Sequence, residues 1–329
     1  MKILYAIQGT GNGHISRSLE IIPYLEPYGT VDILLSGTQW QVQFPYKIQY
    51  RKHGLFYISS MRGGINFLGS LKQMHIRELI GDIRELPVQD YDIIVSDCEP
   101  ISAWACYLTK KRCLALSKQA SFFSSKIPRP QAKSRFLESV IKYYAYCSEY
   151  IGYHYEPYDS FITTPIIKQK IRTAAKSDNG HVTVYLPAYD PQELIKHFEK
   201  FSELQWQLFH PRIVTAYSYK NCLLSPITAA YEQSILSAHG IICAAGFQST
   251  AEGLYLGKKM LIVPHYHQYE QWCNAIALQQ LGVTVVEKIT PDFAERLRNW
   301  LYRAQAVHKN YPDNAQEIAE KIIKRFTKN

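Results

Sequence analysis

The first candidate for chemistry is His14, which follows three glycines in the stretch GTGNGHISR at residues 9–17. An imidazole titrates near neutral pH and can take a proton from an attacking hydroxyl. Glycines allow positive φ and let the backbone approach a ligand, and the N–H groups that begin a helix attract negative charge. The sequence therefore predicts His14 as a general base in a loop that contains Gly9, Gly11, Asn12, Gly13 and Arg17. A surface histidine at a helix N-terminus fits the local sequence equally well.

This loop is not a dinucleotide fingerprint. The pattern G-x-G-x-x-G needs a third glycine at the position of His14, and an acid at the end of the second strand to bind a ribose. The second apolar run, TVDILLS at residues 30–36, is followed by a glycine instead. The phosphate-binding pattern G-x-x-x-x-G-K-S/T is also missing from the sequence. These mismatches argue against a nicotinamide or flavin enzyme, and we expect no cofactor.

Two carboxylates, Asp97 and Glu99, stand at the end of the apolar strand YDIIVSD at residues 91–97. Open α/β sheets bind ligands at the carboxyl ends of their strands, so both side chains are candidates for the site. Either one could pair with His14 and increase its basicity, or hydrogen-bond an acceptor hydroxyl. The alternative is an aspartate that caps a helix next to an exposed glutamate.

A second group of polar residues lies in the segment 239–283, which we expect to form a strand, a turn, a helix, a strand, a polar loop and a helix. The turn AAGFQSTAE places Gly246, Ser249 and Thr250 where a helix N-terminus can hold phosphate oxygens. Glu252, just inside that helix, can accept hydrogen bonds from both hydroxyls of a ribose. The polar groups after the next strand suit the hydroxyls of a sugar, and they are His265, Glu270, Gln271 and Asn274.

This segment resembles the donor-site signature of GT-B glycosyltransferases, especially the peptidoglycan GlcNAc transferase and plant UDP-glucosyltransferase types. Those families carry a G-x-x-[ST]-x-x-E turn, a strand that ends in proline, and an acid–glutamine pair shortly before Asn-Ala. The N-terminal stretch from Gly9 to Arg17 resembles the first loop of the same superfamily, G-x-G-x-G-H-x-x-R. The residues that match the donor signature are Gly246, Ser249, Glu252, Pro264, Glu270, Gln271, Asn274 and Ala275.

The resemblance implies a GT-B fold, in which two Rossmann-like domains face a cleft, and a UDP-sugar donor. It implies that Glu252 holds the uridine ribose and that Glu270 and Gln271 contact the transferred sugar. His14 would be the base or an organiser of the active site, and the reaction would invert the sugar. The expected donor-binding set is Gly246, Phe247, Gln248, Ser249, Thr250, Glu252, His265, Glu270, Gln271 and Asn274.

The elements that must position these residues alternate between strands and helices along the whole chain, which is typical of a parallel α/β architecture. The pattern fades over residues 156–180 and then restarts, so we expect domains at 1–160 and 161–312 and a helix at 313–329 that packs back on the first domain. We expect helices at 16–25, 67–86 and 190–201. The expected strands are 2–8, 30–36, 91–97, 112–117, 149–155, 181–187, 204–210, 240–246, 258–264 and 282–287.

Composition adds information about partners. The net charge of +9 fits a phosphorylated ligand or an anionic membrane surface as well as a general excess for solubility. The basic loop at 124–136 could grip an acceptor phosphate or a bilayer, or be only solvated. No apolar run is long enough to span a bilayer and the chain begins with a strand pattern, so we expect a cytoplasmic protein or one at the inner membrane face. No nucleic-acid-binding module is visible.

Asp90 and Asp92 form a D-x-D pair that precedes its strand, on the wrong side of the sheet for a GT-A metal site, and we expect no metal. The function we expect is transfer of a sugar from a nucleotide sugar to the hydroxyl of a lipid-linked or saccharide acceptor. Two alternatives stay open: a UDP-GlcNAc 2-epimerase-like enzyme, and a protein that binds a nucleotide sugar without turnover. The first-domain loop resembles a transferase more than an epimerase.

Overall fold

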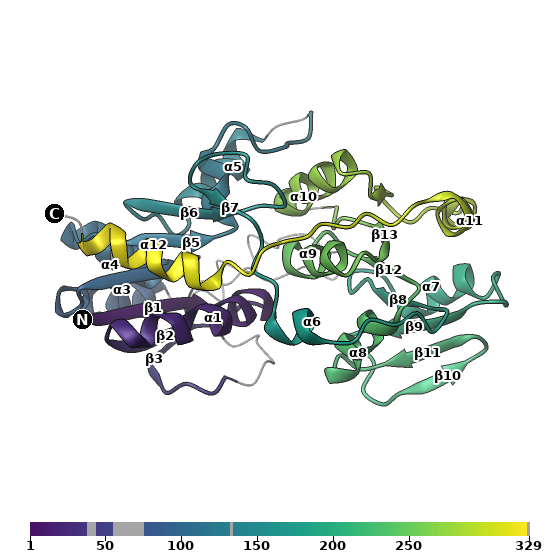
Figure 1. The fold of residues 1–329 in the computed structure, drawn as a ribbon, viewed down its shortest axis with the longest axis horizontal. Coiled ribbons are helices and arrows are strands. Elements are labelled where there is room, and N and C mark those ends of the chain that lie inside the picture. Colours follow the sequence, from purple (N-terminus) through teal and green to yellow (C-terminus); the bar gives the residue numbers. More distant parts are fainter. Residues whose placement is uncertain (38–43, 55–75, 132–133, 267, 328–329) are drawn as a thin grey trace.

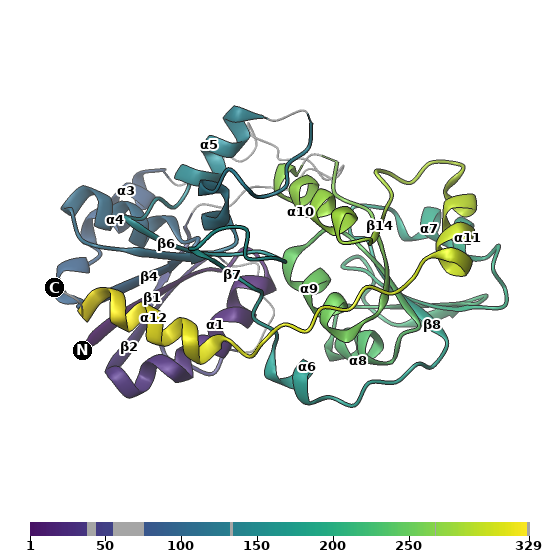
Figure 2. The same cartoon turned by 45° about the horizontal axis from the view of Figure 1, so that its top comes forward.

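The computed structural model describes residues 1–37, 44–54, 76–131, 134–266 and 268–327, which form two α/β domains (Figure 1). Each domain is built on a twisted sheet with helices on both faces. The turned view in Figure 2 shows that α1, α9 and α10 lie toward the middle of the molecule, where the domains meet. No helix in the described part of the chain combines the length and apolar character needed to cross a membrane.

The first domain contains a parallel sheet of order β3-β2-β1-β4-β5-β6-β7. Its strands are apolar runs that are buried along most of their length, because helices cover both faces. The strands are β1 (Lys2–Gln8), β2 (Thr30–Ser36), β3 (Ile48–Lys52), β4 (Ile93–Asp97), β5 (Leu114–Ser117), β6 (Glu149–Tyr153) and β7 (Ile162–Thr163). The helices are α1 (Asn12–Leu25), α3 (Ile76–Glu85), α4 (Pro100–Thr109) and α5 (Arg135–Tyr143), with short 3₁₀ turns η1 (Glu26–Tyr28), η2 (Val88–Asp90) and η3 (Gln119–Phe123).

The second domain repeats the pattern with the order β10-β11-β9-β8-β12-β13-β14. Only β10 runs antiparallel to its neighbour among the described strands. The strands are β8 (His181–Tyr185), β9 (Gln205–Phe209), β10 (Tyr217–Tyr219), β11 (Cys222–Ser225), β12 (Gly240–Cys243), β13 (Lys259–Ile262) and β14 (Thr284–Val285). The helices are α7 (Pro191–Phe198), α8 (Ala229–Ser237), α9 (Phe247–Leu256), α10 (Tyr269–Gln280) and α11 (Phe293–Arg303).

The chain crosses between the domains twice. The first crossing follows β7 and contains the short helix α6 (Gln169–Thr173), and the second leads from α11 back to α12 (Ala315–Thr327). Arg172 ties the two crossings together, since its guanidinium donates to the carbonyls of Tyr311 (3.0 Å) and Pro312 (2.5 Å). Helix α12 lies against α1, and Arg325 near its end donates to the Tyr150 carbonyl at 3.0 Å. The last helix is therefore attached to the first domain.

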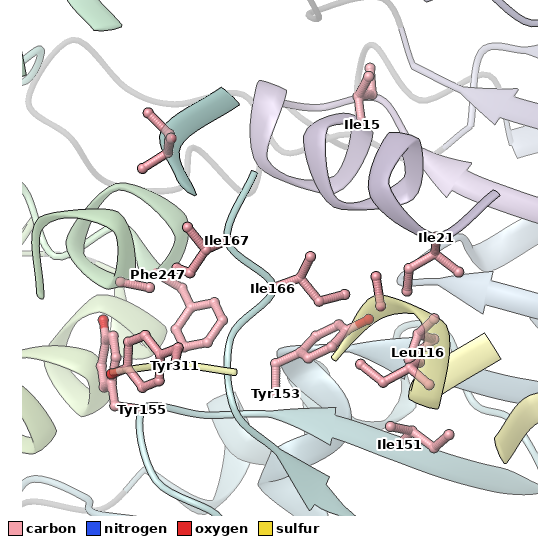
Figure 3. Close-up of a cluster of buried hydrophobic side chains, with 14 of the residues drawn as sticks. Ile15, Ile21, Leu116, Ile151, Tyr153, Tyr155, Ile166, Ile167, Phe247 and Tyr311 are labelled. Atoms are coloured by element: carbon pink, nitrogen blue, oxygen red, sulfur yellow. The ribbon is translucent and has the colours of Figure 1, made fainter. Parts of the chain in front are cut away.

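An apolar core continues from the first domain into the second (Figure 3). Tyr155 follows β6, and its ring centroid lies 5.0 Å from that of Phe247, the first residue of α9. The Tyr155 hydroxyl lies 2.6 Å from Thr250 Oγ1, so a buried hydrogen bond joins the domains beside this ring pair. Burial of two aromatic rings typically stabilises a contact by several kcal/mol, about 1.5–3 kcal/mol for each side chain. This contact fixes α9 next to the first sheet.

The α/β class with two sheet domains is confirmed, and all ten expected strands are present, with individual ends shortened by up to three residues. The strands β3, β7, β10 and β11 were not predicted. Helix α1 begins at Asn12 rather than residue 16, so Gly13 is helical despite its low propensity. Helix α3 begins at Ile76, and the first part of the helix predicted at 67–86 lies outside the described residues.

Candidate active site

The two domains enclose a cavity of about 1130 Å³. The carboxyl ends of parallel strands meet at one edge of a sheet, and those edges of both sheets face this cavity. Residues after β1, β4 and β5 line it from the first domain, and residues after β12 and β13 line it from the second. This volume slightly exceeds the roughly 300–1,000 Å³ of most small-molecule pockets, so the cavity can hold a large ligand.

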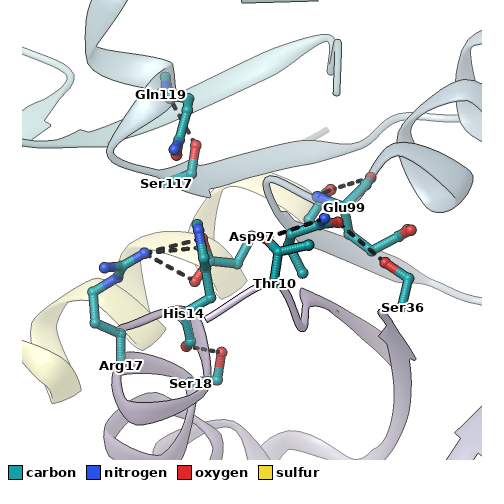
Figure 4. A network of polar contacts seen from close by, with 12 residues as sticks. Thr10, His14, Arg17, Ser18, Ser36, Asp97, Glu99, Ser117 and Gln119 are labelled. Atoms are coloured by element: carbon teal, nitrogen blue, oxygen red, sulfur yellow. Dashed lines mark hydrogen bonds and ion pairs between the residues drawn. The ribbon is translucent and has the colours of Figure 1, made fainter. Parts of the chain in front are cut away.

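His14 and Asp97 form a pair at the first-domain wall (Figure 4). β1 and β4 are parallel neighbours with Ile7 opposite Asp97, so the first turn of α1 lies directly beside the end of β4. His14 Nδ1 is 2.7 Å from Asp97 Oδ1. The Asp97 side chain is 1% exposed, whereas that of His14 is 17% exposed and lines the cavity. A buried carboxylate thus holds an accessible imidazole.

Arg17 completes this group from the next turn of α1. Its Nη2 lies 3.0 Å from His14 Nδ1 and 3.3 Å from Asp97 Oδ1. A guanidinium only donates and a carboxylate only accepts, so Nδ1 cannot satisfy both contacts. The shorter contact to the carboxylate assigns the proton to Nδ1, and the Arg17 hydrogen bond then goes to Asp97. This tautomer leaves the His14 Nε2 lone pair as a proton acceptor.

The structure separates Asp97 from Glu99, and the prediction that both face the cleft is wrong for Glu99. Cys98 between them has φ 57°, a left-handed conformation that turns the chain. Glu99 is fully buried and caps α4, because its carboxylate accepts from the backbone N–H groups of Ile101 (2.9 Å) and Ser102 (2.7 Å). Its oxygens are used by the helix and do not line the cavity. The capping residue is therefore the glutamate and not the aspartate.

The glycines of the loop leave free space beside the backbone, and they do not adopt left-handed backbone angles. Gly11 has an extended backbone with φ 167°, and a Cβ added there would meet no atom within 4 Å. A Cβ on Gly13 would lie 3.7 Å from Gln248 Cβ of α9, so the two motifs face each other across the cavity. Asn12 also lines the cavity, whereas Gly9 is buried behind it with its N–H bonded to the Ser36 carbonyl.

The second-domain wall centres on the N-terminus of α9. Gly246 precedes the helix, and no side chain of the described residues caps it. Gly246, Phe247, Gln248 and Ser249 line the cavity. The first N–H groups of a helix have no partner within the helix, and with the helix dipole they attract an anion. This end of α9 is thus suited to phosphate oxygens.

Two predicted donor residues hold this helix instead of lining the cavity. Thr250 is fully buried, and its Oγ1 donates to the Gly246 carbonyl at 2.7 Å and accepts from the Tyr155 hydroxyl. Asn274 is 1% exposed, and its Nδ2 donates to the Ala245 carbonyl at 3.0 Å. Both side chains fix the turn before α9, so their position does not support the predicted contact with the donor.

Glu252 lines the cavity one turn into α9 but already has partners. It is 4% exposed, and its Oε1 accepts from Gln248 Nε2 at 2.8 Å and lies 3.3 Å from Lys168 Nζ. Lys168 comes from the first crossing and also contacts Glu232 Oε1 at 2.5 Å. Burial raises the pKa of the Glu252 carboxyl, and the ammonium of Lys168 opposes that rise. A ribose at Glu252 would share the carboxylate with this lysine or displace it.

The start of α10 brings Glu270 and Gln271 to the same cavity. Glu270 Oε2 accepts from Gln119 Nε2 of the first domain at 3.0 Å, so this carboxylate bridges the cleft. Gln271 Oε1 accepts from the backbone N–H of His265 at 3.0 Å, which fixes the loop before α10. The side chain of His265 is outside the cavity lining, and burial lowers its pKa. The prediction of a donor contact by its imidazole is therefore not supported by its position.

Several residues at the site were not predicted. Lys118 and Gln119 directly follow the strand predicted at 112–117, so the signal that identified Asp97 was present for them too. Lys168 has no such signal, because it lies in the crossing segment. Helix α5 contributes apolar side chains, which are Leu137, Val140 and Ile141, and Tyr144 follows them.

The basic loop at 124–136 is less available to bind a phosphate or a bilayer than its composition indicates. Arg129 side-chain exposure is 7%, and its guanidinium contacts Glu138 and four backbone carbonyls. Residues 132–133 lie outside the described residues. Elsewhere in the described chain, no group of three or more His, Cys, Asp or Glu side chains could hold a metal ion.

Comparison with known proteins agrees with this geometry. Residues 1–304 match the model of a family described as glycosyl transferase family 1. No curated protein sequence matches the chain. Among solved structures, UGT89C1 of Arabidopsis thaliana complexed with UDP is 13% identical with a TM-score of 0.60, covering 100% of this chain and 96% of that one.

Two bacterial structures share the fold to a similar degree. MurG of Acinetobacter baumannii is 14% identical with a TM-score of 0.57, and the alignment covers 98% of this chain and 99% of that one. The glycosyltransferase SnogD of Streptomyces nogalater is 13% identical with a TM-score of 0.55. The alignment covers 100% of this chain and 95% of that one. The two-domain GT-B fold and the glycosyltransferase activity expected from the sequence are thereby confirmed. Because the family match covers most of its length, the chain belongs to glycosyl transferase family 1.

Proposed function

We propose that the enzyme moves a sugar from a UDP-linked donor to an acceptor hydroxyl and inverts the sugar's configuration. The observation that carries this proposal is that one cavity brings together the His14–Asp97 pair and the uncapped N-terminus of α9. The first supplies a base and the second an anion site, which are the two groups that a displacement of a diphosphate requires.

The donor binds mainly to the second domain. Its diphosphate lies at the N-terminus of α9, near Gly246 and Ser249, and its ribose hydroxyls reach the Glu252 carboxylate. Lys168 then remains paired with Glu232, so the ammonium keeps a counterion when the ribose arrives. Structures that share the fold are complexes with UDP and, for the Arabidopsis protein, with UDP-L-rhamnose, which supports uridine as the base.

The acceptor approaches from the first domain. His14 Nε2 takes the hydroxyl proton as the acceptor oxygen bonds to the anomeric carbon, and the bond from that carbon to the diphosphate oxygen breaks. Asp97 stabilises the imidazolium that results. The N–H groups and dipole of α9 stabilise the negative charge on the leaving diphosphate. Attack opposite to the leaving group in one step inverts the anomeric centre.

The apolar side of the cavity favours an acceptor with an apolar portion. Leu137, Val140 and Ile141 of α5 face the cavity, while Phe136 on the same helix is 66% exposed. A lipid-linked sugar at the inner face of an anionic membrane fits this arrangement better than a free saccharide, and it would place the enzyme in assembly of the cell envelope.

Two variants test the proposal. We expect UDP to raise the melting temperature of the wild type without added metal, and Glu252→Ala to lose most of that stabilisation. His14→Ala should keep UDP binding and lose turnover, as monitored by UDP release with lipid-linked acceptors. Lack of stabilisation by any nucleoside diphosphate at millimolar concentration would show that the donor proposal is wrong. Full turnover by His14→Ala would exclude its role as the base.

A further inference from the structure

We propose that Lys118 is a further donor-binding residue, whose ammonium reaches from the first domain to the β-phosphate of the nucleoside diphosphate. This inference rests on the proposed function and adds a contact that the anion site on α9 does not supply. It also assigns a role in donor binding to the first domain, which otherwise supplies only the base and the acceptor side.

Lys118 lies at the point where the two walls of the cavity meet. It directly follows β5 at the carboxyl edge of the first sheet and lines the cavity, although only 1% of the residue is exposed. Its Nζ lies 5.7 Å from the centroid of the Phe247 ring and 4.9 Å from that of Phe122. Since Phe247 is the first residue of α9, the ammonium is close to the helix N-terminus that attracts the diphosphate.

The ammonium is incompletely satisfied in the described chain. A lysine has three N–H donors, and the acceptor that the structure gives to Nζ is Ser121 Oγ at 3.2 Å. No carboxylate of the described residues lies within 4.0 Å of Nζ. Burial without a counterion lowers the pKa of this lysine to about 8, and the Glu270 carboxylate only partly opposes that change.

Other buried cations in the described part of the chain contact carboxylates or backbone carbonyls of the protein. Arg17 contacts Asp97, and Lys168 contacts Glu232 and Glu252. Lys258 is 8% exposed and donates to the carbonyls of Ser177 and Ala238, each at 2.7 Å. A buried ammonium costs free energy unless it is paired. Lys118 differs because its missing partner lies on the side of the cavity, and an anionic ligand there would supply it.

A phosphate oxygen is the partner that the surroundings favour. The open N–H groups of α9 and the ammonium of Lys118 both donate, so an acceptor with several oxygens and a negative charge satisfies both. The contact spans the cleft and can form only when the donor lies on the second domain. Lys118 would therefore join the two domains through the diphosphate.

The experiment compares UDP with UMP by titration calorimetry at pH 7. We expect Lys118→Met to weaken UDP binding by about 10- to 100-fold, the range of a charge-assisted hydrogen bond. UMP lacks the β-phosphate, so its affinity should change less than about twofold, which also shows that the variant is folded. Lys258→Met, which removes a buried lysine outside the cavity, is the matched control and should leave both affinities unchanged.

The outcomes separate the inference from the proposed function. Failure of the wild type to bind UDP contradicts the proposed function itself. Normal UDP binding by Lys118→Met overturns the role of Lys118 and leaves the proposed function intact. Equal losses for UDP and UMP also overturn it, because a contact to the β-phosphate cannot affect UMP. If Lys118→Met affects only a donor whose sugar carries a carboxylate, the lysine binds the sugar instead and the β-phosphate contact is wrong.

The pH dependence is a second readout. The ammonium is present below pH 8 in the free protein, so its contribution to UDP affinity is complete there and decreases as the pH rises above 8. We expect wild-type affinity for UDP to fall by up to about tenfold for each pH unit above 8, and Lys118→Met to lack this fall. The groups that face the ammonium and are common to both proteins are Glu270, Cys273, Arg129, Arg17 and His154. Identical pH profiles would contradict the proposal.

Discussion

The two walls of the cavity differ in how far their polar groups are already paired within the protein. On the first-domain wall, Asp97 holds both His14 and Arg17 through contacts of 2.7–3.4 Å. On the second-domain wall, no side chain in the described ranges caps the N-terminus of α9, and Glu252 is held by Lys168. The base is held by a carboxylate of its own domain, whereas no side chain of the described residues pairs with the first N–H groups of α9. The difference indicates that donor binding completes a site whose catalytic pair already exists.

Removal of the base His14 is the strongest test of the first-domain wall. We expect His14→Ala to lower kcat by about 10³-fold, the usual contribution of a general base, with UDP affinity changed less than twofold. Initial rates and calorimetric titrations measure both quantities. Glu99→Gln is a suitable control for the nearby carboxylates, because it changes the cap of α4 and should leave kcat close to that of the wild type. A slow Glu99→Gln enzyme would mean that the two carboxylates are not functionally separate.

The incompletely paired ammonium of Lys118 on the first-domain wall should reduce stability as well as bind ligand. The folded-state pKa of Lys118, about 8, lies below its unfolded value, so below pH 8 the buried charge opposes folding in full. Stability should therefore rise as the pH increases from 8 toward 10.5, by up to about 3 kcal/mol. Lys118→Met should be more stable than the wild type at pH 7 and should lack this rise. Urea unfolding at several pH values measures the effect, and a destabilised Lys118→Met would contradict it.

The ribose contact can be tested by changing both protein and ligand. We expect Glu252→Ala to bind UDP about 10- to 30-fold more weakly, as expected for lost hydrogen bonds to a charged group. The wild type should prefer UDP to 2′-deoxy-UDP, and the variant should bind the two about equally. If the variant keeps the preference, another residue binds the ribose 2′-hydroxyl.

The smallest expected effect is on the helix that carries the donor site. Tyr155→Phe removes the hydrogen bond to Thr250 and should lower the free energy of unfolding by about 1 kcal/mol. UDP affinity should not change, because Thr250 supports α9 and does not touch the donor. Chemical denaturation and calorimetry on the same sample check both parts. A loss of UDP affinity without a loss of stability would indicate that Thr250 contacts the donor.

Much of the first wall could be predicted, because a polar residue at the end of an apolar strand must lie at the ligand edge of a parallel sheet. That reasoning locates Asp97 and applies equally to Lys118, although Lys118 belongs to no known motif. It could not separate Asp97 from Glu99, since the left-handed turn at Cys98 has no sequence signal.

The second wall shows the limits of a signature. Gly246, Ser249 and Glu252 line the cavity as the motif predicts, but Thr250 does not. Helical spacing indicates the reason, since Phe247, Ala251 and Leu254 form the buried face of α9 and Thr250 lies on that face. The ion pair of Lys168 with Glu252 joins distant segments, and nothing local in the sequence predicts it.

A crystal structure of the enzyme with UDP tests the central claim most directly. The account predicts that the diphosphate lies at the N-terminus of α9, with the ribose hydroxyls on Glu252 and a β-phosphate oxygen within hydrogen-bond distance of Lys118 Nζ. His14 and Asp97 should keep their 2.7 Å contact. UDP bound away from α9, or a His14–Asp97 pair that separates when UDP binds, would contradict the account.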